Sequence, residues 1–188
     1  MNRLPLFLLM TAVTALPAWG GAKRPEKNRL TFHIQGNQAD GPKMVFPVPI
    51  GNRQVFFRKT PVTLNKEILT LKHFQTKDST FGATFSFNKT GAQRIAAITT
   101  SEREKWLVAM LNGRPVDLVH IDKPVLDGKL VIWQGITLSE IIRFEYAMPI
   151  TGETQEQWKE RIKGHEQQRK AAQKEMREAQ KERNRRAQ

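Results

Sequence analysis

The chain has 188 residues, no cysteine and a formal net charge of +13 at neutral pH. Without cysteine it can form no disulfide and offers no thiol nucleophile or thiolate metal ligand, so an apolar core must stabilise it. The excess of Lys and Arg favours anionic partners such as lipid headgroups, acidic polysaccharides or nucleic acid.

The first 22 residues have the order of a secretory signal peptide. Arg3 precedes an almost continuous apolar run over residues 4–16, and small residues follow around Trp19. The run is too short for a stable membrane-spanning helix, which needs about 20 residues. We therefore expect cleavage after Ala22, with Gly20 as the alternative small residue at the site, and a mature chain in the periplasm or outside the cell, without a transmembrane segment. The alternative is an uncleaved membrane anchor.

Residues 23–29 are polar and basic and are interpreted as a linker, and residues 30–150 as an α+β domain that begins with strands. Alternating apolar residues predict a half-buried strand at 30–34. Turn residues at 36–42 and at Gly51-Asn52 separate this strand from an extended segment at 44–48 and from a strand at 54–58.

The central part of the chain gives clearer signals. Phe81 to Phe87 alternates apolar and small or polar residues, as in a strand with one buried face. Thr90 and Gln93 fit a capping box that opens a helix ending near Thr100. A buried strand at 106–111 is followed by Asn112-Gly113, the strongest short signal of a hairpin, and by a return strand at 115–121.

A further strand at 130–134 precedes a second capping box, Thr137 to Glu140, and a short helix. Apolar residues flank Trp106 and Trp133, so we expect both indoles in the core. The predicted core residues are Phe85, Phe87, Ile95, Ile98, Leu107, Ala109, Val131 and Trp133.

Residues 153–188 form a charged tail. Nearly every residue is charged, Gln or Ala, and apolar residues are too few for a sustained coiled-coil heptad pattern. The pattern predicts an extended, exposed helix or a disordered segment. Together, the predictions describe an α+β fold: a small mixed or antiparallel sheet with one or two packed helices, followed by the charged helix.

Several segments between Phe56 and Ile142 resemble, in order and spacing, the first periplasmic domain of SecD, an accessory subunit of the bacterial Sec translocon. The matching segments are Phe57-Arg58-Lys59-Thr60-Pro61, Phe85-Ser86-Phe87, Thr90-Gly91-Ala92, Ile98-Thr99, residues 107–111, Asn112-Gly113-Arg114-Pro115-Val116, Pro124-Val125-Leu126-Asp127-Gly128 and Ile132-Trp133-Gln134-Gly135-Ile136-Thr137-Leu138. The resemblance implies the fold of the SecD head, a small α+β module. It does not carry over translocase activity, because SecD uses membrane helices that are not expected here and has a small-Ala-Pro segment where this chain has Val116-Asp117-Leu118-Val119.

The residues suggest no catalytic, cofactor or metal site. His120 and Asp122 could offer two ligands to a metal, but zinc usually requires three or four, and a surface His beside a loop Asp is the simpler interpretation. No serine lies in a Gly-x-Ser-x-Gly elbow. The basic end of the tail supplies the candidate anion contacts, which are Lys181, Arg183, Arg185 and Arg186.

Two functional hypotheses follow. The first is an exported, non-catalytic interaction module with a SecD-head-like fold that binds an unidentified envelope protein. The second is a basic envelope protein that binds an anionic surface or polyanion, namely anionic lipid, polysaccharide or nucleic acid, of which nucleic acid is least favoured. An enzyme is the weakest alternative.

Overall fold

The computed structural model describes residues 27–186, so the predicted signal peptide and its cleavage site lie outside the described residues. The strands are β1 (Leu30–Ile34), β2 (Val45–Ile50), β3 (Arg53–Arg58), β4 (Ile68–Gln75), β5 (Phe81–Phe87), β6 (Trp106–Leu111), β7 (Arg114–His120) and β8 (Lys129–Ile136). The helices are α1 (Lys89–Ser101), α2 (Leu138–Ala147) and α3 (Gln155–Arg186), with two short 3₁₀ turns, η1 (Gln38–Asp40) and η2 (Asn65–Glu67).

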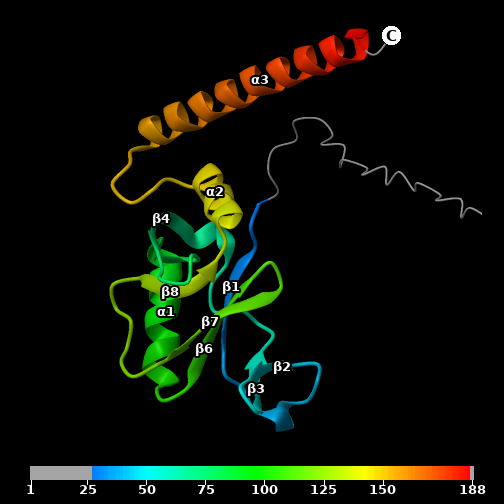
Figure 1. The fold of residues 1–188 in the computed structure, drawn as a ribbon. Helices are drawn as coiled ribbons and strands as arrows, with labels where there is room; N and C mark the ends of the chain where they lie inside the picture. The colour runs from blue at the N-terminus through cyan, green and yellow to red at the C-terminus, as the bar shows by residue number, and fades with distance from the viewer. Residues whose placement is uncertain (1–26, 187–188) are drawn as a thin grey trace, which may run out of the picture.

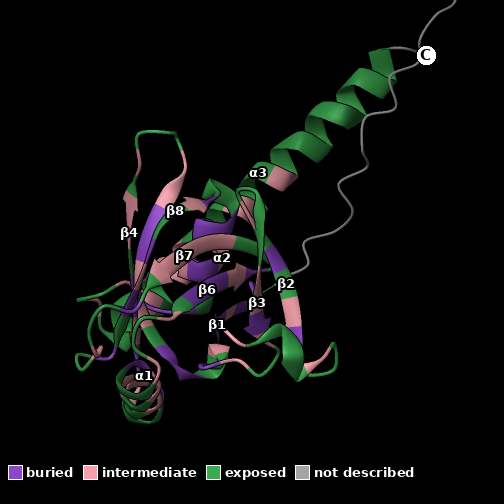
Figure 2. Cartoon of the chain, turned by 90° about the horizontal axis from the view of Figure 1, so that it is seen from below, coloured by how far each residue is buried: buried purple, intermediate pink, exposed green. Residues whose placement is uncertain are grey.

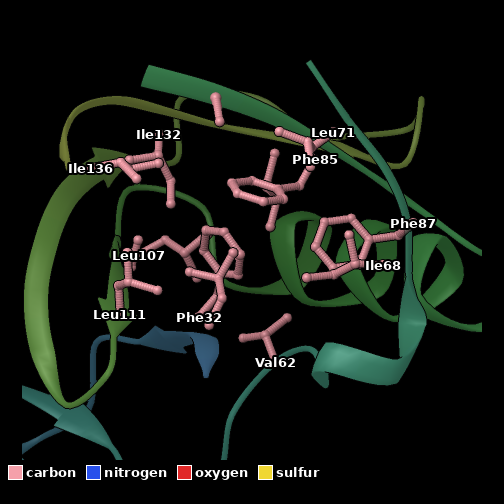
Figure 3. Packing of buried hydrophobic residues seen from close by; sticks show 14 of the residues in the cluster. Phe32, Val62, Ile68, Leu71, Phe85, Phe87, Leu107, Leu111, Ile132 and Ile136 are labelled. Atoms are coloured by element: carbon pink, nitrogen blue, oxygen red, sulfur yellow. The ribbon is translucent and has the colours of Figure 1, made fainter. Parts of the chain in front are cut away.

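The described strands form three antiparallel sheets, with orders β1-β6-β7, β2-β3 and β4-β5-β8 (Figure 1). The inner faces of the two three-stranded sheets share one apolar core, in which Phe32 and Leu107 face Phe85 and Ile132 (Figure 3). Ile95 of α1 and Phe144 of α2 complete this core. The predicted α+β class is therefore confirmed.

The β2–β3 hairpin covers the outer face of the β1-β6-β7 sheet. Phe57 and Val48 of the hairpin pack with Val108 of β6 in a second, smaller apolar cluster. Both faces of β6 are consequently buried, which explains the unbroken run of apolar residues in this strand.

Strands β7 and β8 lie side by side without a regular backbone ladder, and a carboxylate joins them. One carboxylate oxygen of Asp117 accepts the backbone N–H of Trp133 at 2.6 Å, and the other accepts the N–H of Leu118 at 2.8 Å. Gly135 has a φ of 86°, and a Cβ built there would lie 2.9 Å from the carbonyl oxygen of Val116. Asp117 and Gly135 thus allow the two sheets to meet closely at this junction.

Local signals fix the ends of several elements. Asn112 and Gly113 both have positive φ, 52° and 86°, as the type I′ hairpin between β6 and β7 requires. Thr137 caps α2 with a capping box, as predicted, because its side chain accepts the Glu140 N–H. The predicted cap of α1 is wrong: Asn88, not Thr90, accepts a backbone N–H, that of Gly91 at 2.9 Å.

The last residues of the predicted linker belong to the folded domain. Asn28 is buried and donates to the carbonyl oxygen of Glu140 at 2.7 Å, while the Arg29 N–H donates to the Asn112 side chain at 2.9 Å. The Glu140 carboxylate also accepts Arg114 at 2.6 Å. Burial raises the pKa of Glu140, but its hydrogen bonds from Thr137 and the nearby Arg114 guanidinium bring the pKa below its ordinary value. This polar cluster fastens the start of β1 to α2.

The prediction that Trp106 and Trp133 are core residues is wrong. Their exposed fractions are 37% and 61%, whereas the neighbouring Leu107 and Ile132 are buried. The inward positions of β8 are Leu130 and Ile132, so the predicted register of this strand is off by one residue.

α3 is the longest element and is largely exposed. It contains no buried residue, and Figures 1 and 2 show it leaving the body of the domain. Thr154 and Gln157 form a capping box at its start: the Thr154 N–H donates to the Gln157 side chain at 2.9 Å, and the Gln157 N–H donates to the Thr154 hydroxyl at 3.2 Å. Within the described part of the chain, no helix has the length and apolarity needed to cross a bilayer.

Candidate functional site

The predicted anion contacts lie on the last two turns of α3. Lys181, Arg183 and Arg185 are exposed, and Arg186 pairs with Glu182 at 2.6 Å. No side chain from another element gathers with them into an enclosed site in the described structure. Any anion binding here would therefore rest on the density of charge rather than on a shaped pocket.

The structure reveals a second basic site that the sequence did not identify, a hollow of about 430 Å³ between α2 and the first turns of α3. We call it the α2–α3 groove. Four cationic side chains line it: Lys27, Arg143, Lys159 and Lys163. Its apolar and aromatic lining comes mainly from Tyr146, Trp158 and Ile162, and Glu166 is its one acidic lining residue.

The start of α3 is held against α2 by four residues that we call the α3 clamp: Glu145, Glu153, Trp158 and Arg161. The Trp158 indole N–H donates to the carbonyl oxygen of Glu145 at 3.0 Å. Arg161 donates through two nitrogens to both carboxylate oxygens of Glu153, each at 2.8 Å, and lies 4.0 Å from the Glu145 carboxylate. Two-point bonding of this kind fixes direction as well as distance.

The charges of the clamp are strongly coupled. The hydrogen bonds from Arg161 lower the pKa of Glu153 to about 2, with a further contribution from the Ile150 N–H, although partial burial opposes the shift. The same hydrogen bonds raise the pKa of Arg161. His73 of β4 extends the network, because its Nε2 lies 2.9 Å from the Glu145 carboxylate. α3 is thus attached to α2, which in turn contacts the β4-β5-β8 sheet.

Only weak sequence signals point to the groove. Trp158 and Ile162 stand four residues apart in an otherwise polar tail, so they share one side of a helix. Their partners on α2 and at Lys27 are far away in sequence, and only the tertiary fold brings them together. A Cβ built at Gly164 would meet no atom within 4 Å, so this glycine does not indicate a close contact at the groove.

The other residues considered from sequence have structural surroundings. His120 lies 3.2 Å from the carbonyl oxygen of Glu104 and packs edge-on against Trp106. Asp117 closes the β7–β8 junction, and Asp127 accepts the Lys129 N–H at 3.2 Å in a turn. Among residues 27–186, no group of three or more His, Asp or Glu side chains is arranged to hold a metal ion.

Comparisons with known proteins bear on the fold. No family model matches the chain, and no curated protein matches it in sequence. Part of the chain is similar to solved structures of SecDF, with TM-scores below 0.5. One is a crystal structure of SecDF in its super-membrane-facing form, with 16% identity, a TM-score of 0.41, and coverage of 60% of this chain and 17% of that one. The other is a structure of SecDF, a membrane component that enhances protein export, with 17% identity, a TM-score of 0.42, and coverage of 61% and 58%. Both of these neighbours are SecDF structures.

Proposed function

We propose that this chain is an exported, non-catalytic interaction module of the cell envelope, and that α3 with the α2 surface that holds it is its binding element. The observation that carries this proposal is that α3 is a long, polar, exposed helix whose first turns are held in place by the α3 clamp. A helix that is polar on all sides gains little from packing, so such helices usually bridge to something else or depend on side-chain pairs along their length. The clamp fixes the direction of α3, which favours presentation to a partner.

The charge of α3 is unevenly distributed. Residues 155–168 hold three Lys or Arg and three Glu, whereas residues 169–186 hold eight Lys or Arg and three Glu. The half nearest the domain is therefore balanced, and the half that leaves the domain carries all of the helix's net positive charge. This separation favours the second candidate function, attachment to an anionic surface or polyanion, as a specific form of the first.

The experiment that tests the proposal is capture from an envelope extract with three forms of the mature chain. The first is complete, the second ends after Gly152, and the third ends after Gln168 and so keeps the clamp and the groove. A partner captured only by the complete chain at both low and high salt supports a protein-binding module. Capture of heparin or acidic polysaccharide that is lost at high salt supports polyanion binding. Equal capture by all three forms would contradict a role for α3.

A further inference from the structure

The α2–α3 groove has the composition of a site for an anionic ligand. Its four cations come from three separate segments of the chain, the start of the described domain, α2 and α3. Lys159 and Lys163 are also four residues apart on one helix, a spacing at which like charges destabilise the helix. Cationic side chains that lie close together repel one another, and an anion bound between them would offset this repulsion.

The four groove cations are not held in ion pairs by the described parts of the protein, although Glu166 also lines the groove. Between residues 27 and 186, Arg58, Arg94, Arg114 and Arg161 each pair with a carboxylate within 4.0 Å. In the same range, none of Lys27, Arg143, Lys159 and Lys163 forms an ion pair. Arg143 donates only to Ser139, one turn earlier in α2, at 3.2 Å.

The uncharged part of the groove indicates an amphipathic ligand. Tyr146, Trp158 and Ile162 supply an apolar lining, and the hydrogen bond from the Trp158 indole to Glu145 fixes the orientation of that ring. On the exposed side of α2, Ile142 and Leu138 have exposed fractions of 42% and 58%. Apolar residues beside Trp, Tyr and basic residues are typical of protein surfaces that lie at the boundary between lipid headgroups and acyl chains.

We propose that the α2–α3 groove binds the phosphate headgroup of an anionic phospholipid, with Leu138 and Ile142 meeting the bilayer surface beside it. The groove, about 430 Å³ in volume and open to solvent, is large enough to admit a phosphate headgroup. A free phosphate ion would use the cations but would gain nothing from Trp158 and Ile162, so the lining favours the lipid. This inference rests on the proposed function, in which α3 and the α2 surface that holds it form the binding element, and it names an anionic phospholipid as the ligand of the groove. The basic distal half of α3 remains a separate candidate for polyanion binding, which the distal control variant below distinguishes.

The test is co-sedimentation of the mature chain with phosphatidylcholine vesicles that do or do not contain phosphatidylglycerol. Near an anionic surface each Lys or Arg contributes about fivefold to binding. The triple variant Arg143→Gln, Lys159→Gln, Lys163→Gln should therefore bind phosphatidylglycerol vesicles about a hundredfold more weakly than the wild type. The matched control replaces Lys181, Arg183 and Arg185 by Gln, which removes the same charge from the far end of α3, and should bind at least tenfold better than the groove variant.

A second variant tests the apolar contact without changing charge. Leu138→Gln with Ile142→Gln should weaken vesicle binding, and both residues are exposed, so the domain should melt as the wild type does. Inorganic phosphate should not compete with the vesicles at equal phosphate concentration; full competition would identify a free-anion site and overturn the lipid assignment.

Three further results would overturn the inference. They are equal binding to vesicles without phosphatidylglycerol, undiminished binding by the groove variant, and a greater loss in the distal control than in the groove variant. The last result would leave the proposed polyanion-binding role of α3 intact. If the complete chain binds no vesicle, lipid binding is excluded, but the proposal that α3 binds a protein partner is not.

Discussion

Replacing Phe85 by Ala should destabilise the domain far more than replacing Trp133 by Ala. Phe85 is fully buried at the centre of β5, and its ring packs edge-on against Phe144 of α2 with 5.2 Å between ring centroids. Loss of such a side chain costs about 3–5 kcal/mol, because the cavity collapses only in part. For a chain of this length, that loss corresponds to a fall of about 6–20 °C in the melting temperature.

Trp133 is larger than Phe85 but has an exposed fraction of 61%, and it meets Phe74 on the outer face of the sheet at 6.2 Å between centroids. Its removal should therefore cost at most about 1 kcal/mol, the value of an exposed cross-strand pair. Urea unfolding followed by circular dichroism measures both free energies, and equal slopes of the two transitions confirm that they can be compared. The reasoning fails if Trp133→Ala costs as much as Phe85→Ala, since the register of β8 would then be that expected from the sequence.

Three other predictions follow from the structure and the sequence. Arg161→Met should speed hydrogen exchange at the indole N–H of Trp158, which NMR can follow. Arg161 lowers the pKa of Glu153 from 4.5 to about 2. The difference in exchange rate between variant and wild type should therefore be full above pH 4.5 and should vanish as the pH falls toward 2, where Glu153 becomes protonated. Gly113→Ala should lower the free energy of unfolding by about 1–2 kcal/mol, because a φ of 86° disfavours any side chain; an unchanged urea midpoint would contradict the type I′ turn. N-terminal sequencing of the envelope fraction should find a chain that starts after Ala22, whereas an intact Met1 in the cytoplasm would refute export.

Much of the domain could be predicted from local patterns. Three signals depend only on neighbouring residues and so can be recognised without knowing the fold. They are the Asn112-Gly113 turn, the capping residue Thr137 and the alternation of apolar residues in β5. β8 shows the limit of this approach. Leu130 to Trp133 is an unbroken apolar run, and a run without alternation does not say which residues face the core. Only the packing of Ile132 against the other sheet decides it.

The two candidate binding sites differ in how far the sequence could predict them. The distal cations from Lys181 to Arg186 could be found because charge density is a property of the sequence itself. The α2–α3 groove could not, since Lys27, Arg143 and Lys159 approach one another only after β1 and α3 have both docked on α2. The hydrogen bond from Asn28 to Glu140 could not be predicted either, because the two residues are far apart in sequence, although this bond determines where the folded domain begins.

The clamp holds α3 at one end only, so any tilt of the helix relative to the domain occurs about a pivot near Arg161. At 1.5 Å per residue, about 37 Å of helix extends from this pivot to Arg186. A tilt of about 10° at the pivot would sweep the basic tip through about 6 Å, by the same geometry. The stiffness of the contacts between Arg161 and Glu153 therefore governs how wide a volume the tip searches, and loosening these contacts would enlarge that volume without altering a single charge at the far end.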